Sequence, residues 1–164
     1  MHRMVLAPSV LLIVGTDTDD LVRRVREYSA RADLTLVEGA GGLLSPLTWE
    51  HNVMDCEEQA DGSGPFHHGL LAQAVDAPVL LVAQDRLGTI SHTLMALKVL
   101  ELSRLEVVGV VLTAPEQPDA STGSNGAAIA RLSSCSRLLC VPRTHDPEVT
   151  SGCIQEVTHW LRIA

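Results

Sequence analysis

The chain has 164 residues, of which 46% are hydrophobic and 20% are charged, and its formal net charge is −8 at pH 7. These values are typical of a globular protein, and the length predicts a single domain over residues 1–164. Only 12 residues are Lys or Arg. This number excludes a general nucleic-acid surface, which requires clustered positive charge, but it leaves room for one local anion site.

The cysteines and the start of the chain predict a cytoplasmic protein with reduced thiols. The four cysteines form no CxxC pair, and no stretch near the start has the pattern of a secretory signal. The longest apolar run there, residues 10–14, is much shorter than the about 20 residues of a membrane helix, so no membrane span is expected. We predict that Cys135 and Cys140 are small core residues.

Short apolar runs alternate with amphipathic stretches along the chain, which is the pattern of parallel strands joined by crossover helices. The apolar runs predict five strands, each buried on both faces, at residues 10–14, 34–38, 79–83, 107–112 and 137–141. The amphipathic stretches predict helices at residues 19–31, 70–75, 89–102, 125–133 and 147–163. The predicted fold class is therefore α/β, with a mostly parallel sheet of about five strands and helices on both faces, a three-layer Rossmann-like arrangement.

Two loops interrupt this alternation. Residues 43–68 contain Pro and Gly with little periodicity, apart from a short helix expected at residues 56–60, and residues 114–124 form a second loop. Ligands of open parallel sheets bind beyond the carboxyl ends of the strands, and both loops leave from that edge. We therefore expect the ligand site there.

Other polar residues of these regions have ordinary explanations. His67 and His68, with His51 and Cys56 in the same loop, match no standard zinc spacing, so a solvated polar loop is expected. Asp85 and Arg86 follow a predicted strand, where a substrate contact is conceivable and an exposed ion pair is the prediction.

The most informative motif is Val-Glu-Gly-Ala-Gly-Gly at residues 37–42. A carboxylate at the tip of a strand, followed by three glycines in four positions, lies beside a backbone that a ligand can approach closely. Glu38 could hold a hard cation, and the glycine amides could face a phosphate or a carboxylate. A tight turn with an exposed Glu explains the same residues, and the motif alone does not separate the two explanations.

Residues 37–47, VEGAGGLLSPL, resemble the VEGAGGxxxPL segment of dethiobiotin synthetases. Four later blocks follow in the family's order: PVLLVA with LGTISHTL at residues 78–94, EVVGVVL at residues 106–112, Asn125 with Ile129 and Arg131, and LLCVP at residues 138–142. The chain thus resembles the carboxyl-terminal two-thirds of such an enzyme. The resemblance implies a phosphate-loop NTPase-like fold and a homodimer that uses ATP, magnesium and carbon dioxide to close the ureido ring of 7,8-diaminopelargonate.

The resemblance also implies roles for individual residues. Glu38 is the expected magnesium ligand, and Thr113 and Pro142 are expected to border the adenine. The expected substrate-binding residues, some of them at the partner subunit's site, are Gly41, Gly42, Gly88, Thr89, Ile90 and Ser91.

The chain departs from the family at the phosphate-binding loop. Gly15 and Thr16, in a Gly-Thr-Asp-Thr run, resemble the first half of the family's GTDTxVGKT loop and are expected at the nucleotide, but no GK[ST] occurs in the 164 residues. Either a long internal segment has been lost here, or the run is a coincidence in a chain that starts late. Both alternatives remove the lysine that neutralises the transferred phosphoryl group.

Smaller departures affect the rest of the site. Thr113 replaces the family's Asn at the adenine, Ser91 replaces another Asn, and Cys140 replaces a Gly. A hydroxyl cannot reproduce the donor and acceptor pair of an amide, so base selection should be looser.

Three functions stay open. The first, which we predict, is a dethiobiotin-synthetase-like protein of biotin synthesis, impaired or inactive because the missing lysine costs orders of magnitude in rate. The second is a non-catalytic dimeric binding or regulatory module. The third is another phosphate-loop relative, such as the domain attached to some acyltransferases or a cobyrinate-type amide synthetase. The expected partners are a second copy and a small anionic substrate or nucleotide, with no nucleic acid and no membrane.

Overall fold

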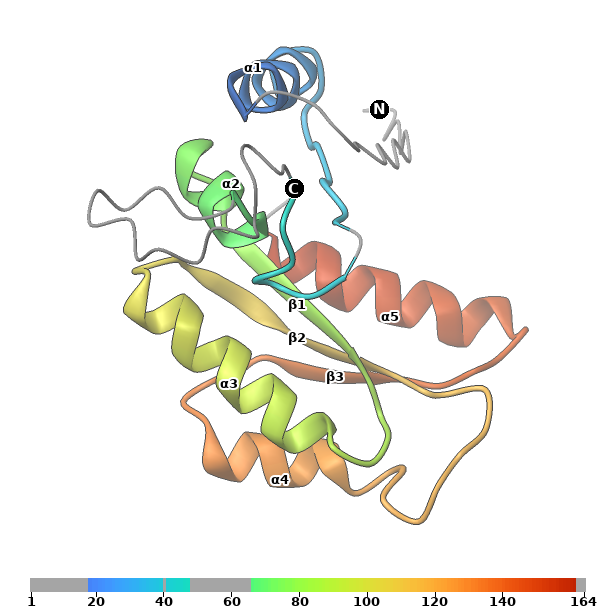
Figure 1. The fold of residues 1–164 in the computed structure, drawn as a ribbon. Helices are drawn as coiled ribbons and strands as arrows, with labels where there is room; N and C mark the ends of the chain where they lie inside the picture. The colour runs from blue at the N-terminus through green and yellow to red at the C-terminus, as the bar shows by residue number, and fades with distance from the viewer. Residues whose placement is uncertain (1–17, 40, 48–65, 162–164) are drawn as a thin grey trace. The chain divides into compact units, whose positions relative to one another are not determined.

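The computed structural model describes residues 18–39, 41–47 and 66–161, and Figure 1 shows its elements. The chain divides into two compact units, Met1–Ala77 and Pro78–Ala164. The elements in chain order are α1 (Thr18–Ser29), α2 (His68–Ala74), β1 (Val79–Gln84), α3 (Thr89–Leu102), β2 (Val107–Thr113), α4 (Asn125–Leu132), β3 (Leu138–Val141) and α5 (Pro147–Trp160).

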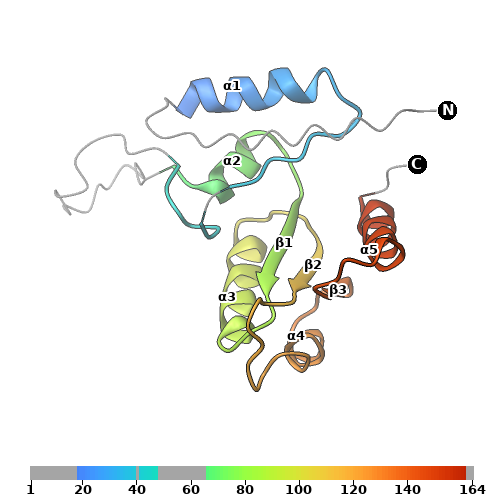
Figure 2. The same cartoon turned by 90° about the vertical axis from the view of Figure 1, so that its right-hand side faces the viewer.

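The second unit is a three-layer α/β arrangement around a parallel sheet. The strands lie in the order β1-β2-β3, and both neighbouring pairs are parallel. Because consecutive parallel strands need a crossover, α3 connects β1 to β2 and α4 connects β2 to β3. Figure 2 shows α3 and α4 on one face of the sheet and α5 on the other.

The core of this unit is built on the central strand β2. On one face Val110 and Leu112 pack with Ile129 of α4, and all three side chains are fully buried. On the other face Val108 and Val111 pack with Trp160 of α5. The register between β1 and β2 shifts by one residue at the start of the pair, an irregularity of the bulge type. The central strand is therefore buried on both faces, as its continuous apolar run predicts.

The edge strand β1 only partly fulfils the same prediction. Leu81 and Ala83 lie partly buried against the core beneath α3 and α4, whereas Val82 is 58% exposed. An edge strand has a neighbouring strand on one side only, so its apolar side chains are buried to different degrees.

The structure contradicts one predicted strand. Residues 34–39 form neither helix nor strand, and the side chains of Leu36 and Val37 are exposed. Apolar character alone does not make a parallel strand, because every ladder hydrogen bond needs a neighbour. No segment in the described ranges pairs with this one. The described sheet thus has three strands instead of five; the strand predicted at residues 10–14 and the helix at residues 56–60 lie outside the described residues.

The first unit contains a small helical core of its own. Leu21 and Val25 of α1 pack with Leu71 of α2, and the partly buried Phe66 lies against them. The Arg26 guanidinium donates a hydrogen bond of 2.8 Å to the carbonyl oxygen of Ala74, at the end of α2. The remaining predicted helices agree with the structure, apart from shifts of one to three residues at their ends. Across the described ranges, no helix has both the length and the apolar character that crossing a bilayer requires.

Two glycines test how tightly α5 packs on the sheet. A Cβ at Gly109 would lie 2.7 Å from ring carbons of Trp160 and 3.0 Å from the carbonyl oxygen of Arg137. We expect Gly109→Ala to lower the free energy of unfolding by about 1–3 kcal/mol through overpacking. A Cβ at Gly152 of α5 would meet no described atom within 4 Å. Gly152→Ala should therefore raise the free energy of unfolding by about 0.5–1 kcal/mol, because alanine favours helix. Guanidinium titration followed by circular dichroism checks both signs; stabilisation by Gly109→Ala would contradict the packing described here.

Candidate functional site

The carboxyl ends of the three strands bring several sequence-predicted residues to one edge of the sheet. Gly88 lies just before α3, Thr113 ends β2, and Pro142 directly follows β3. Thr113 pairs in register with both neighbouring strands, and the Ala114 amide donates to the carbonyl oxygen of Val141 at 2.9 Å. The substrate residues expected around Gly88 and the residues expected at the adenine therefore lie at one edge of the second unit, whereas Gly41 and Gly42 belong to the first unit.

The start of α3 has the geometry of an uncapped helix terminus. Gly88 has φ 90°, a left-handed conformation that residues with a Cβ rarely adopt. No side chain caps this terminus, and the Thr89 amide donates to the carbonyl oxygen of Arg86 at 3.1 Å. Ser91 and His92 are exposed in the first turn, whereas the side chain of Thr89 is buried. Backbone amides of such a first turn favour an anionic group.

The hydroxyl of Thr113 is directed at the neighbouring strand. Its Oγ1 donates to the carbonyl oxygen of Ala83 at 3.4 Å, across the pair of β1 and β2. Only the lone pairs of this oxygen are then left for a ligand, whereas an amide side chain would offer a donor as well.

Asp85, the first residue after β1, is buried, and the predicted exposed ion pair with Arg86 is wrong. The carboxylate is 6% exposed; its Oδ1 accepts from Asn125 Nδ2 at 2.7 Å, and its Oδ2 accepts from the Gly123 amide at 2.8 Å. A buried carboxylate needs such donors, and here they are neutral groups of Gly123, in the loop before α4, and of Asn125, the first residue of α4. An Asp directly after a parallel strand, facing an Asn at the start of a later helix, is the sequence signal that could have indicated it.

A second carboxylate ties the same two loops together. Oδ1 of Asp119 accepts from the amide and the hydroxyl of Ser121 at 2.8 and 2.6 Å, while Oδ2 accepts from the Leu87 amide at 2.7 Å. The Ser121 hydroxyl, followed by the Leu87 amide, lowers the pKa of Asp119 to about 2. The loop before α3 and the loop before α4 are thus linked by two acidic side chains.

Cys140 differs from its predicted place in the core. It is exposed on β3, while Cys135 is half-buried against the core beneath α3 and α4. Partial burial, and after it the negative charge of Asp85, raise the pKa of the Cys140 thiol. A thiol with a raised pKa carries less thiolate near neutral pH and reacts more slowly.

In the first unit, the glycine-rich motif ends in a hydrogen-bonded turn. Gly41 has φ 93°, the Gly42 amide donates to Ser45 Oγ at 2.8 Å, and the Ser45 amide donates to the carbonyl oxygen of Gly42 at 2.8 Å. Glu38 is exposed. Its carboxylate is accessible to a ligand, whereas the Gly42 amide is already engaged by Ser45.

The prediction of a solvated loop is wrong for His67 and His68. His67 Nδ1 accepts from the Leu70 amide at 3.3 Å and so caps α2, and burial, with His68 beside it, lowers the pKa of His67. Both ring nitrogens of His68 are buried, and neither has a hydrogen-bond partner among the described residues. His51, Gly15 and Thr16 lie outside the described residues.

The described residues fit magnesium in one coordination mode. Within residues 18–39, 41–47 and 66–161, no group of three or more His, Cys, Asp or Glu side chains could hold a metal ion. Magnesium in phosphate-transfer sites is held by one or two carboxylates together with substrate phosphates and water. The single exposed carboxylate of Glu38 fits that mode and does not form a cage made of protein ligands alone.

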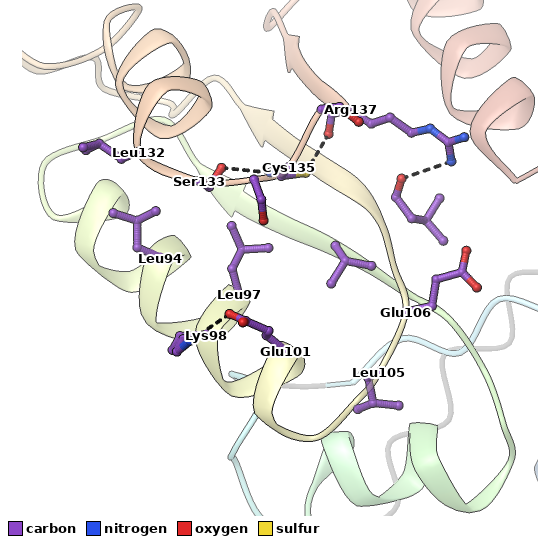
Figure 3. Close-up of a pocket in the computed structure, with 14 residues that line it drawn as sticks. Leu94, Leu97, Lys98, Glu101, Leu105, Glu106, Leu132, Ser133, Cys135 and Arg137 are labelled. Carbon is purple, nitrogen blue, oxygen red and sulfur yellow. Dashed lines mark hydrogen bonds and ion pairs between the residues drawn. The ribbon is translucent and has the colours of Figure 1, made fainter.

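A cavity of ≈ 760 Å³ lies at the opposite edge, where the strands begin (Figure 3). Three of its four charged side chains have partners in the protein: Lys98 pairs with Glu101 at 2.9 Å, and the Arg137 guanidinium donates to the carbonyl oxygens of Val108 and Trp160. None of the residues predicted for the site lines this cavity. The carboxyl edge therefore remains the candidate site.

Comparison with known proteins identifies the family. The AAA_26 family, described as an AAA domain, matches residues 69–150, which is half of the chain and includes all three strands. The chain belongs to this family. The matched residues contain Gly88 and Thr113, so this part of the carboxyl edge lies within the AAA domain.

The relatives of this AAA domain include dethiobiotin synthetases. The chain is 40% identical over 128 residues to the ATP-dependent dethiobiotin synthetase of Anaeromyxobacter dehalogenans strain 2CP-1, covering 77% of this chain and 50% of that protein. It is 35% identical over 125 residues to that of Rhodococcus erythropolis strain PR4, covering 76% and 49%. It is 38% identical over 117 residues to that of Caulobacter vibrioides strain NA1000, covering 68% and 47%. The chain spans about half the length of these curated relatives.

The tie made by Asp119 should depend on pH in a defined range. Its pKa is about 2 in the folded chain against an ordinary 3.8. Because the folded-state pKa is the lower one, the stabilisation is complete above the ordinary pKa and is lost as the pH falls through about 2. As the pH is lowered, we expect the chemical shift of the Leu87 amide in NMR spectra to change with a midpoint near pH 2 while the fold persists. Asp119→Asn is the control, since it cannot titrate; a midpoint near 3.8 in the unchanged chain would contradict the described hydrogen bonds.

Proposed function

We propose that the chain is a dethiobiotin-synthetase-like protein that binds a nucleotide and 7,8-diaminopelargonate at the carboxyl edge of its sheet, and that it has lost most of the ATP-dependent ring closure. The observation that carries this proposal is the meeting of Gly88, Thr113 and Pro142 at one edge. The dethiobiotin synthetases among the relatives support the ligand class.

The proposed ligands suit the chemistry of the edge. The uncapped amides at the start of α3 favour the substrate carboxylate, and Thr113 and Pro142, at the ends of the paired strands β2 and β3, are the proposed border of the adenine. Magnesium would arrive with the nucleotide phosphates, and Glu38 of the first unit is proposed separately as an exposed carboxylate that can hold a hydrated magnesium ion. Magnesium would supply charge neutralisation at those phosphates, and the residues of this chain would bind and orient the nucleotide and the diamine.

The proposed loss of catalysis rests on charge. Phosphoryl transfer depends on groups placed to neutralise developing negative charge, and removing one such group typically lowers kcat by about 10²–10³. No GK[ST] sequence occurs in the chain. Binding can survive this change, because amides, apolar contacts and shape contribute to ground-state affinity without the lysine.

Calorimetry and turnover together test the proposal. We expect ATP to bind weakly and more tightly with magnesium, and turnover of 7,8-diaminopelargonate with ATP and bicarbonate to be at least about 100-fold below that of a dethiobiotin synthetase that carries the loop. Glu38→Gln should weaken the binding of magnesium alone, measured by the same calorimetry. Glu106→Gln, at the opposite edge, is the matched control, since it removes one exposed carboxylate far along the strands from the site.

Each result decides one part. Turnover equal to that of the complete loop enzyme would contradict the loss of catalysis. Absence of both nucleotide and diamine binding would contradict the site and leave the non-catalytic module. Thr113→Asn adds a check on the base: an amide should raise ATP affinity by about 3- to 10-fold, the worth of one hydrogen bond, with a smaller gain for GTP.

A second proposal concerns the homodimer, and exposed apolar side chains on and just before α3 support it. Leu87, Met95 and Leu102 are 81%, 56% and 72% exposed. Met95 and Leu102 are seven positions apart and therefore share one face of the helix, while Leu87 lies in the loop beside the proposed substrate-binding turn. Such an exposed apolar stripe suits a subunit contact.

Sedimentation tests the dimer. We expect the wild type to dimerise and Met95→Glu to raise the dimer dissociation constant about tenfold or more, because a charge would replace an apolar contact. Ile154→Glu on α5 is the matched control, since Ile154 is similarly exposed at 50% on the other side of the sheet. A wild type that stays monomeric, or equal effects of the two variants, would contradict the proposed interface.

A further inference from the structure

The proposed substrate-binding turn at Gly88 ends the loop of residues 85–88, and two carboxylates connect this loop to the loop of residues 114–124. We propose that Asp85 is a positioning residue, whose buried carboxylate holds the loop of residues 85–88 against the loop of residues 114–124 and thereby fixes the start of α3 for substrate. This inference rests on the proposed function for its ligand, and on the geometry of the second unit for its mechanism.

The first step is the cost of burying the carboxylate. Asp85 is 6% exposed and Asn125 is 2% exposed, so the hydrogen bond between them is shielded from water. A buried ionised carboxylate is costly unless donors surround it, and the Asn125 amide and the Gly123 backbone amide are those donors. Moving either loop away would leave the charge without a partner. The buried charge therefore favours one relative position of the two loops.

The second step is the hydrogen bond that links Asp85 to Thr113, the residue proposed to border the adenine. The backbone amide of Asp85 donates to the carbonyl oxygen of Thr113 at 2.9 Å, so one residue is bonded both to the end of β2 and, through its side chain, to the loop that follows it. Asp119 acts in the reverse direction, because it lies in the later loop and accepts from the Leu87 amide. Residues 85–88 are thus held at both ends.

The third step is the dependence of α3 on this loop. Gly88 begins the helix without a side-chain cap and with φ 90°, so its orientation comes from the backbone that precedes it. The preceding backbone is the segment that the two carboxylates hold. Small displacements of positioning groups weaken ligand binding strongly, because several amides must point at one group together. A loosened loop should therefore weaken the binding of the diamine more than the binding of a ligand at another place.

The decisive variant is Asp85→Asn, which keeps the shape and changes the hydrogen bonds. One carboxylate oxygen becomes an amide donor, which then faces the donor of Asn125 or of Gly123. The double variant Asp85→Asn with Asn125→Asp exchanges donor and acceptor between the two side chains, and the remaining amide oxygen at position 85 can still accept from the Gly123 amide. Glu116→Gln is the matched control, since it removes a carboxylate from the same loop at a side chain that is 81% exposed.

Two readouts separate positioning from simple stability. Amide hydrogen exchange by NMR should become at least about tenfold faster at Gly123 and Leu87 in Asp85→Asn, with little change at Val110 in the sheet. Calorimetry with 7,8-diaminopelargonate should show an affinity about tenfold lower, with a smaller effect on ATP. The exchanged pair should recover part of both effects, and Glu116→Gln should leave both within about twofold of the wild type.

The outcomes distinguish this inference from the proposed function. Unchanged exchange at Gly123 and Leu87 overturns the tie, and faster exchange with unchanged diamine affinity overturns the positioning role. A wild type that binds no diamine overturns the proposed function and the positioning role with it, while exchange still decides whether the carboxylate ties the loops. If Asp85→Asn does not fold, Asn125→Ala removes one donor and keeps the Gly123 bond; unchanged exchange at Leu87 in that variant also overturns the proposal.

Discussion

The parallel pairing of β2 with both of its neighbours is the constraint on which the second unit depends. Parallel strands run in one direction, so their carboxyl ends reach the same edge, and every connection must return along a face of the sheet. The helices α3, α4 and α5 then cover the two faces. Burial of Val110 and Leu112 on one face, and of Val111 on the other, holds the central strand in register. Residues far apart in sequence consequently meet at one edge.

Two carboxylates of that edge, Asp85 and Asp119, serve the protein's own backbone, and this bears on both the proposed binding and the proposed loss of catalysis. Asp85 and Asp119 accept hydrogen bonds from the protein itself, so they organise the backbone of the two loops. The backbone amides they organise can bind an anionic group. Stabilising a transferred phosphoryl group requires a placed positive charge, which these residues do not supply. Geometry suited to binding and chemistry suited to transfer are therefore separable properties of one edge.

Sequence periodicity predicted the elements whose burial is determined locally. The helix at Thr89–Leu102 has its predicted bounds, and β2 extends its predicted strand by one residue. Residues 34–38 share the apolar character of β2 but lack a described neighbour, so the same pattern gave a wrong strand there. The predictions for Asp85 and His67 were wrong for a related reason. A polar side chain after a strand or in a loop is expected to be solvated, and only the hydrogen-bond partners seen in the fold show that it is buried or caps a helix.

The sequence by itself determined the family relationship, the α/β class and the absence of a GK[ST] loop in this chain, because these follow from ordered motifs and residue identities. Tertiary structure alone decided that Asp85 is buried, that Cys140 is exposed, and that Gly88, Thr113 and Pro142 share one edge. Burial and proximity arise from segments that lie many residues apart, such as residues 85 and 125 in one hydrogen bond. A local pattern contains no information about which distant donor will reach a given carboxylate. The pairing of the strands determines it, because it brings the segments that carry the donor and the carboxylate together.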